Sequence, residues 1–384
     1  MPEKKKKYLY EVDLLRIIFI FGVLINHVST KFNAAIPNGQ IQSTFLYGSH
    51  LAFHFTRMGF MFVTGLVLFL NYYSKKFSVL GFWRKRFFGV IWTYLIWIAI
   101  YTFSNQLGAG TLSWGNFWKE TLHVWQFGDE FYMYYILVVL QLYVIFPFLI
   151  WMFKKFDHKK ILIISFSFQF ILLFFIKYGL PHIDTSNWLW WFKNYGFNII
   201  VYQFYFIWGG YTAIHYKTVM AKLVEWRRPL GWATLAFALG TVGLFFYNQN
   251  ILHLSMAKTE IVHQPYIFIY DIVIISWVVS LGLLYAEKRQ AGRLPAWVEP
   301  FISLGAKIAF GIYLSQTATL SVLRWVIKAL PVSGWGLVAL FPIGWVFTVA
   351  ITFLLCWFFY KVPPFGLLIG RPQWHISHLW KNKM

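Results

Sequence analysis

Apolar segments long enough to cross a lipid bilayer recur along this chain of 384 residues and constrain its fold more than any other feature. A helix needs about 20 apolar residues to cross the roughly 30 Å hydrocarbon core. Because backbone polar groups inside lipid must be satisfied within the segment, such runs form helices. A transmembrane barrel would instead show segments of about ten residues that alternate in polarity, and the sequence has none. It therefore predicts an all-α, polytopic integral membrane helix bundle.

The composition agrees with this class, since 59% of the residues are hydrophobic and 12% are charged, against about 25% charged in soluble domains. About ten transmembrane helices are predicted, spanning 9–29, 51–73, 88–107, 131–153, 161–178, 196–216, 230–248, 265–285, 303–327 and 335–360. We expect residues 1–384 to form a single transmembrane domain, with an N-terminal segment at 1–8 and a C-terminal tail at 361–384. The single Cys356 excludes an intrachain disulfide.

Lysine and arginine are concentrated in every second connection between the predicted helices. The clusters occupy the N-terminal segment, the connections 74–87, 154–160, 217–228 and 286–307, and the tail. Cytoplasmic loops carry the Lys/Arg excess, so both termini are expected in the cytoplasm and the protein in the bacterial cytoplasmic membrane. This topology accounts for the net charge of +21. The chain shows no basic stripe and no nucleic-acid motif, so no nucleic-acid partner is expected.

The first predicted helix carries ionisable residues at membrane depth. Arg16 and His27 are eleven residues apart. In an α-helix this separation places both side chains on the same face, with a rise of roughly 16 Å between them. Asp13 precedes Arg16 by three residues and can pair with it. A charged group inside a membrane is by default a functional candidate. The alternative is a snorkelling arginine and an interfacial histidine, but the shared face favours a site directed into the bundle.

The second predicted helix adds His50, His54 and Arg57 at i, i+4 and i+7 spacing, near the level of His27. Two histidines at this spacing could bind a metal, but no glutamate follows the first one as in a zinc-protease helix. No third ligand is evident, so no metal is predicted. Arg57, which lies deep in the outer leaflet, is a candidate for substrate binding.

The predicted outer loops 104–130 and 179–195 are rich in tryptophan and contain acidic residues. Tryptophan stacks on sugar rings, and the carboxylates of Asp129 and Glu130 can accept hydrogen bonds from sugar hydroxyls. The alternative is an aromatic belt at the membrane interface. Both interpretations remain open at this point.

Asp13, Arg16 and His27, with ten residues between the arginine and the histidine, resemble the first helix of the acyltransferase family 3 membrane proteins. Further similar segments follow in the family's order at 60–65, 82–86, 132–143, 206–211 and 311–314. The resemblance spans nearly the whole chain. It departs at two positions where family members often carry histidine. These positions are Tyr132 and Gln316, and Gln316 lies two residues after the similar segment 311–314.

The resemblance implies transfer of an acyl group from cytoplasmic acyl-CoA to a hydroxyl of a surface or exopolysaccharide glycan, or of a lipid-linked glycan. Acetyl-CoA is the common donor, and succinyl-CoA or another short acyl-CoA remains open. Polysaccharide biosynthesis proteins are possible partners. The catalytic residues would be His27, as general base, and Arg16. Substrate-binding residues would be Asp13, Arg57, Arg84, Arg86, Asp129, Glu130 and Tyr132.

The arginines of the 84–86 cluster suit the phosphates of CoA, although topology and anionic lipids explain such a cluster equally well. A transporter or flippase that exports a glycan or a lipid-linked glycan is the alternative function. The sequence shows no pair of Gly/Pro-interrupted helices in matching halves, a feature that transporters with internal repeats tend to have. A structural membrane subunit is the third interpretation.

Overall fold

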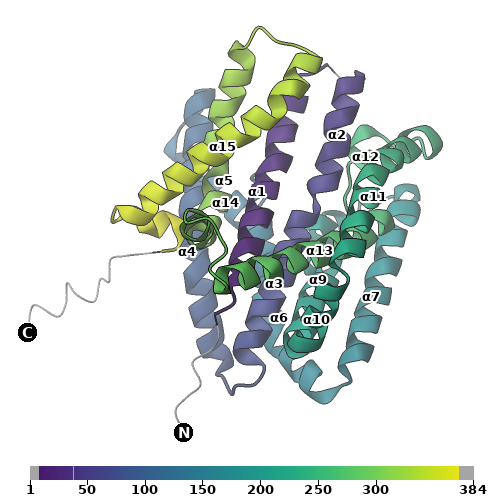
Figure 1. Cartoon of the computed structure of the whole chain (residues 1–384). Coiled ribbons are helices and arrows are strands. Elements are labelled where there is room, and N and C mark those ends of the chain that lie inside the picture. Colours follow the sequence, from purple (N-terminus) through teal and green to yellow (C-terminus); the bar gives the residue numbers. More distant parts are fainter. Residues whose placement is uncertain (1–7, 38, 372–384) are drawn as a thin grey trace, which may run out of the picture.

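The computed structural model describes residues 8–37 and 39–371, which form helices and no strand (Figure 1). The α-helices are α1 (Tyr10–Asn33), α2 (Ile41–Phe53), α3 (Phe55–Tyr72), α4 (Val79–Ala109), α5 (Trp114–Phe127), α6 (Tyr134–Lys155), α7 (His158–Phe174), α8 (Trp190–Lys193), α9 (Gln203–Ile214), α10 (Tyr216–Glu225), α11 (Arg227–Phe246), α12 (Met256–Thr259), α13 (Pro265–Gln290), α14 (Val298–Ala329) and α15 (Trp335–Lys361). Short 3-10 or π turns complete the set: η1 (Phe175–Gly179), η2 (Leu180–His182), η3 (Tyr195–Phe197), η4 (Ile199–Val201), η5 (Tyr247–Ile251) and η6 (Phe365–Ile369).

Nine segments of the described chain are long and apolar enough to cross a membrane. Each corresponds to one of the predicted helices, so the all-α, multi-pass class is confirmed. The predicted span 196–216 is the exception, because the 3-10 turns η3 and η4 lead into a helix, α9, of only 12 residues. Most of α9 is nevertheless buried, so it belongs to the interior of the bundle.

The predicted start of the third membrane helix, at 88, was wrong. Helix α4 begins at Val79, where the Ser78 hydroxyl accepts a hydrogen bond from the Gly81 backbone N–H at 3.2 Å. Arg84 and Arg86 therefore lie on a helix instead of in a loop. A helix of 31 residues is about 46 Å long, so its basic first turns extend beyond the hydrocarbon core.

The second predicted helix, 51–73, also differs, because it begins at Ile41 and is broken at His54 into α2 and α3. The Thr56 hydroxyl donates to the Phe53 carbonyl at 3.1 Å. Side-chain hydrogen bonds of this kind compete with the helical ladder and accompany bends. The break separates His50 from Arg57 and determines where both side chains lie.

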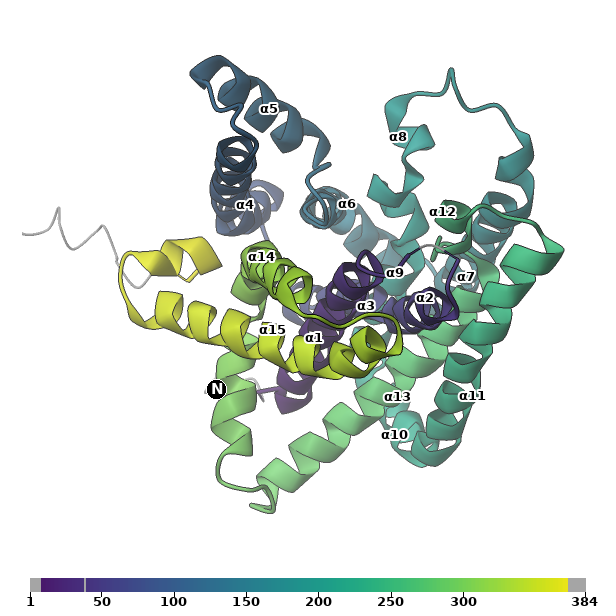
Figure 2. The same cartoon turned by 90° about the horizontal axis from the view of Figure 1, so that it is seen from above.

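Helices α3 and α9 pack closely at the centre of the bundle through glycines. A Cβ atom at Gly65 would overlap the Phe206 carbonyl oxygen, and one at Gly209 would overlap the Phe62 carbonyl oxygen. Small residues let membrane helices approach each other. Helix α1 also lies centrally, beside α2, α3, α13, α14 and α15 (Figure 2).

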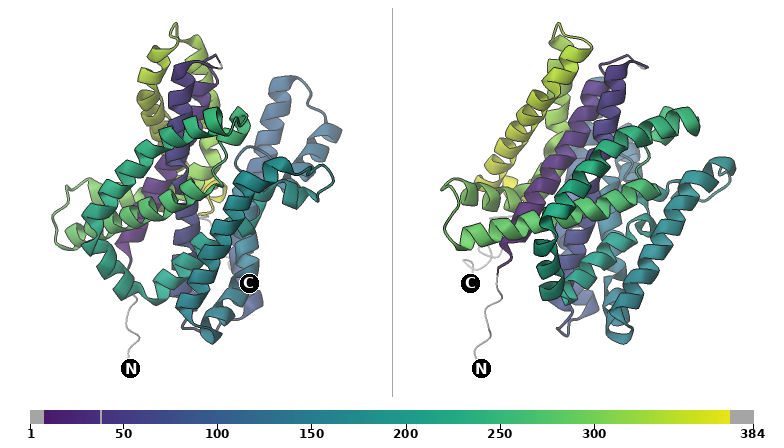
Figure 3. Two further views of the ribbon diagram at one scale, coloured as in Figure 1. Left: turned by 90° about the vertical axis from the view of Figure 1, so that its right-hand side faces the viewer. Right: turned by 45° about the vertical axis from the view of Figure 1, so that its right-hand side comes forward.

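One end of the bundle carries basic segments. The N-terminal end of α1, the α3–α4 and α6–α7 connections and α10 lie together there (Figures 1 and 3). This grouping agrees with the alternation of basic connections in the sequence. The cluster Lys4, Lys5, Lys6 and Lys7 and the tail lysines Lys381 and Lys383 lie outside the described residues.

We expect Gly65→Ala and Gly209→Ala each to destabilise the protein, because the added methyl group meets backbone and not a flexible side chain. Overpacking of this kind costs about 1–3 kcal/mol. Gly89→Ala is the matched control, since a Cβ at Gly89 meets no atom within 4 Å. Thermal unfolding in detergent, followed by tryptophan fluorescence, measures the difference. Equal melting temperatures for all three variants would contradict the tight α3–α9 contact.

Candidate active site

Two cavities lie along α1 and share Phe60, Tyr135 and Tyr313 as a common wall. The first, here named the histidine cavity, has a volume of about 60 Å³. Its lining residues are Val23, Asn26, His27, His54, Thr56, Arg57, Tyr132 and Tyr134, with the three shared ones. The second, named the basic cavity, has a volume of about 360 Å³. Its charged lining residues are Arg16, Arg86, Lys307 and Arg371.

His27 lines the histidine cavity with its ring against two aromatic side chains. Its ring centroid is 4.8 Å from that of Phe131 and 5.2 Å from that of Tyr132. Phe131 has a φ of 47°, which is strained for a residue other than glycine, and such strain clusters at functional sites. Within residues 8–37 and 39–371, His27 has no hydrogen-bond partner. Both ring nitrogens are therefore available to a substrate.

His54 forms a pair with His50 across the break between α2 and α3. Their Nε2 atoms are 2.7 Å apart, and His50 Nδ1 is 3.3 Å from the Asn26 carbonyl oxygen. If His50 Nδ1 donates to that carbonyl, its Nε2 must accept the proton of His54 Nε2. His50 also lines a separate cavity with Ser29 and Glu260. The His50–His54 pair therefore lies between the histidine cavity, which His54 lines, and this separate cavity, which His50 lines.

Metal binding by these histidines has no geometric support in the part of the chain that the structure describes. There, no group of three or more His, Cys, Asp or Glu side chains is placed to hold a metal ion. The structure places His50 and His54, which the sequence analysis considered only as possible metal ligands, within hydrogen-bond distance of each other.

Arg57 extends from α3 into the histidine cavity. Its guanidinium donates a hydrogen bond to the Tyr134 hydroxyl, and its Cζ is 5.4 Å from the centre of the Tyr202 ring. Arg57 Nε and the neighbouring Asn26 Oδ1 are buried and have no hydrogen-bond partner among the described residues. Because buried polar atoms are normally satisfied, these two groups can bind a polar substrate.

The basic cavity brings together residues from four distant segments of the chain. Arg16 comes from α1, Arg86 from α4, Lys307 from α14 and Arg371 from the end of the described chain. Arg16 lies 3.9 Å from Asp13, which also accepts a hydrogen bond from the Tyr8 hydroxyl at 2.8 Å. None of the residues lining this cavity is acidic. The cavity therefore suits an anion.

The other predicted site residues are placed as follows. Tyr132 lines the histidine cavity, and its hydroxyl accepts a hydrogen bond from Thr317 Oγ1 at 2.8 Å. Arg84 is exposed on α4 and lines neither cavity. Asp129 pairs with His123 at 2.7 Å, and Glu130 accepts a hydrogen bond from Asn105 at 3.2 Å. Both acids lie outside the two cavities.

Neither the role of Lys307 and Arg371 nor the shared wall of Phe60, Tyr135 and Tyr313 could be predicted from the sequence. Lys307 and Arg371 had appeared only as members of the basic clusters. The three aromatic residues lie within segments that resemble the acyltransferase family, but nothing in their spacing indicated that they meet.

Residues 9–361, nearly the whole chain, match the acyltransferase 3 family, described as an acyltransferase domain. The protein is therefore a multi-pass membrane acyltransferase. The chain belongs to the acyltransferase 3 family, as the motif of Arg16 and His27 indicated. No curated protein and no solved structure matches it.

We expect Tyr134→Phe to lower acyl transfer about tenfold, because Arg57 loses the hydroxyl to which its guanidinium donates. Hydrogen bonds to charged groups contribute about 1.5–3 kcal/mol. Ester-linked acyl groups in an expressing host measure the effect, at matched membrane levels of protein. Tyr10→Phe is the control, since the Tyr10 hydroxyl has no hydrogen-bond partner in the described chain. Undiminished transfer by Tyr134→Phe would mean that Arg57 is positioned without Tyr134.

Proposed function

We propose that the protein is an O-acyltransferase of the bacterial cytoplasmic membrane. It transfers an acyl group from cytoplasmic acyl-CoA to a hydroxyl of a cell-surface or exopolysaccharide glycan, together with polysaccharide biosynthesis proteins. The observation that carries the proposal is the shared wall between the basic cavity and the histidine cavity. An anionic donor and a hydroxyl acceptor can approach this wall from different sides.

The basic cavity is the proposed site of the donor. CoA carries several phosphate charges, and arginine binds phosphate oxygens through two parallel hydrogen bonds. Arg16, Arg86, Lys307 and Arg371 line this cavity without an acidic residue. All four belong to the segments or helix ends that the Lys/Arg distribution assigns to the cytoplasmic side. This is the side on which acyl-CoA is available.

The histidine cavity is the proposed site of the chemistry. His27 removes the proton from the acceptor hydroxyl, and the oxygen attacks the thioester carbonyl carbon. The new carbon–oxygen ester bond forms as the carbon–sulfur bond breaks, and the CoA thiolate leaves and takes up the proton that His27 removed, which returns His27 to its neutral form. Arg57, directed into the same cavity, stabilises the oxyanion of the tetrahedral intermediate.

Direct transfer, without a covalent acyl-enzyme, fits the placement of the single cysteine. Cys356 is fully buried and lines neither cavity. The histidine cavity, with about 60 Å³, is smaller than the basic cavity, with about 360 Å³. Acetyl-CoA, the common donor that the family resemblance implies, is the proposed donor, and succinyl-CoA or another short acyl-CoA is the alternative.

His27→Ala is expected to reduce ester-linked acyl groups on the envelope polysaccharides at least about 100-fold, the typical contribution of general acid–base catalysis. Arg16→Ala is expected to reduce them about tenfold or more, because Arg16 lines the proposed donor cavity and a charge-assisted hydrogen bond to phosphate contributes about 1.5–3 kcal/mol. Mass spectrometry of glycans from the host measures this loss, at equal membrane levels of protein. His182→Ala is the matched control, because His182 is exposed and lines neither cavity. Ester at the parental level in the His27 and Arg16 variants would contradict the proposal, and glycan export would become the leading function.

Arg86→Ala is expected to raise the KM for acetyl-CoA about tenfold or more, because a charge-assisted hydrogen bond to phosphate contributes about 1.5–3 kcal/mol. Lys76→Ala, in the exposed α3–α4 connection, removes a nearby positive charge outside the cavity and is the control. Initial rates of the purified enzymes at varied acetyl-CoA concentration give the KM of each variant. An equal increase in the KM for acetyl-CoA in the two variants would indicate a general attraction of anions and not a donor site.

A further inference from the structure

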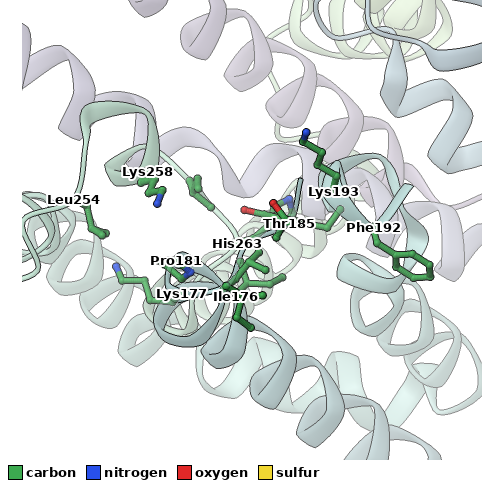
Figure 4. A pocket seen from close by; sticks show the side chains of 13 residues that line it. Ile176, Lys177, Pro181, Thr185, Phe192, Lys193, Leu254, Lys258 and His263 are labelled. Carbon is green, nitrogen blue, oxygen red and sulfur yellow. The ribbon is translucent and has the colours of Figure 1, made fainter. Parts of the chain in front are cut away.

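A further cavity, with a volume of about 240 Å³, shares no lining residue with the cavities described above. It is formed by η1 and η2, by the connection that leads to η3 together with Tyr195 of η3, and by the segment between η5 and α13. Lys177, Lys193, Lys258 and His263 line it (Figure 4), and no acidic side chain does. We refer to it as the lysine cavity.

Lys177 is the buried charge of this cavity, with 9% of its surface exposed. Its ammonium donates to the side-chain oxygens of Asn248 and Gln264, which are both neutral. In residues 8–37 and 39–371 it forms no ion pair. Burying a charge without a counter-charge is costly, so the site is suited to an added anion.

The nearest acidic residues in the sequence are directed to other partners. The Asp184 carboxylate accepts hydrogen bonds from the Ser186 backbone N–H at 2.9 Å and from its hydroxyl at 3.0 Å. Glu260 lines the separate cavity that contains His50. Neither carboxylate lines the lysine cavity, so its positive charge is left for a ligand.

Two π-helical turns build this part of the protein. Lys177 lies in η1 and Asn248 in η5, and the two side chains meet in a hydrogen bond. π-Helical turns are rare and are frequent at functional sites. Two of them that converge on one buried lysine indicate a built site and not an accidental hollow.

The lysine cavity lies next to the histidine cavity. His263 Nε2 is 3.4 Å from the Tyr202 hydroxyl, and the Tyr202 ring lies 5.4 Å from Arg57 Cζ. Tyr202 thus stands between a wall residue of the lysine cavity and a wall residue of the histidine cavity. A ligand that occupied both would extend past this tyrosine.

We propose that the lysine cavity binds an anionic group of the acceptor glycan, a carboxylate or a phosphate ester. The inference rests on the proposed function and specifies its acceptor as an acidic glycan. Phe192 and Tyr195 line the cavity beside the lysines, and aromatic rings can pack against sugar rings. A phospholipid headgroup has the same charge, but these aromatic faces and the adjacent histidine cavity favour a glycan.

The test begins with the structure of the natural product. The repeat unit that the parent enzyme acylates in its host, identified by mass spectrometry, is expected to carry a carboxylate or a phosphate. A neutral acylated repeat would overturn the acidic subsite and leave the proposed function intact. A parent enzyme that esterifies no glycan would overturn the proposed function itself.

The second measurement uses purified enzyme with that glycan and with its carboxyl-reduced or dephosphorylated form. Lys258→Gln is expected to raise the KM for the acidic glycan about tenfold, with kcat and the KM for acetyl-CoA unchanged within about twofold. For the parent enzyme, removal of the acidic group from the glycan is expected to raise the KM for the glycan by a similar factor. Lys119→Gln, an exposed lysine of α5 outside the cavity, is the matched control and should leave both constants unchanged.

Lys177→Gln, checked for folding by size exclusion, should show the same effect and tests the buried lysine directly. Because Lys258 is exposed, its substitution tests the site even if the Lys177 variant does not fold. Unchanged KM values in Lys258→Gln would overturn the inference. An increase in the KM of Lys258→Gln that is seen only in vesicles containing phosphatidylglycerol would also overturn the inference, because the cavity would then bind a lipid headgroup.

Discussion

The absence of water in the hydrocarbon core is the constraint on which the rest of this structure depends. Polar side chains at membrane depth must find partners inside the bundle. Helix α1 shows the consequence, because it is enclosed by α2, α3, α13, α14 and α15. Glu11 accepts a hydrogen bond from Tyr216 on α10, and Asp13 pairs with Arg16. Asn26 and His27, also on α1, line the histidine cavity.

Close packing and local irregularity together create these cavities. The glycine contacts of α3 with α9 hold α3 rigidly against the centre of the bundle. The break at His54 then turns the start of α3 away from α2, so that Arg57 enters the histidine cavity. The strained backbone of Phe131 places its ring against His27 in the same way. Regular helices alone would have filled this space with side chains.

Positive charge is divided between separate cavities, and this division is consistent with two anionic substrates. The basic cavity and the lysine cavity have no acidic lining residue, whereas His27 and Arg57 lie in the histidine cavity. Charges within low-dielectric walls act strongly on ions nearby. In the proposed reaction, donor and acceptor are each held by charge at a distance from the reacting atoms, and chemistry occurs in a small, largely aromatic space.

The sequence by itself determined the membrane class and nine of the predicted helices, and it placed Arg16 and His27 on one helix, α1, because hydropathy and helical spacing are local properties. Only the tertiary structure decided that Arg86 lines a cavity while Arg84 does not, and that Lys307 and Arg371 join it. It also decided that Tyr132, and not Asp129 or Glu130, lies beside His27. The periodicity of the sequence shows which residues share one face of a helix, but it does not show which neighbouring helix that face contacts. The rotation of each helix against its neighbours, and breaks such as that at His54, depend on packing between residues far apart in the chain.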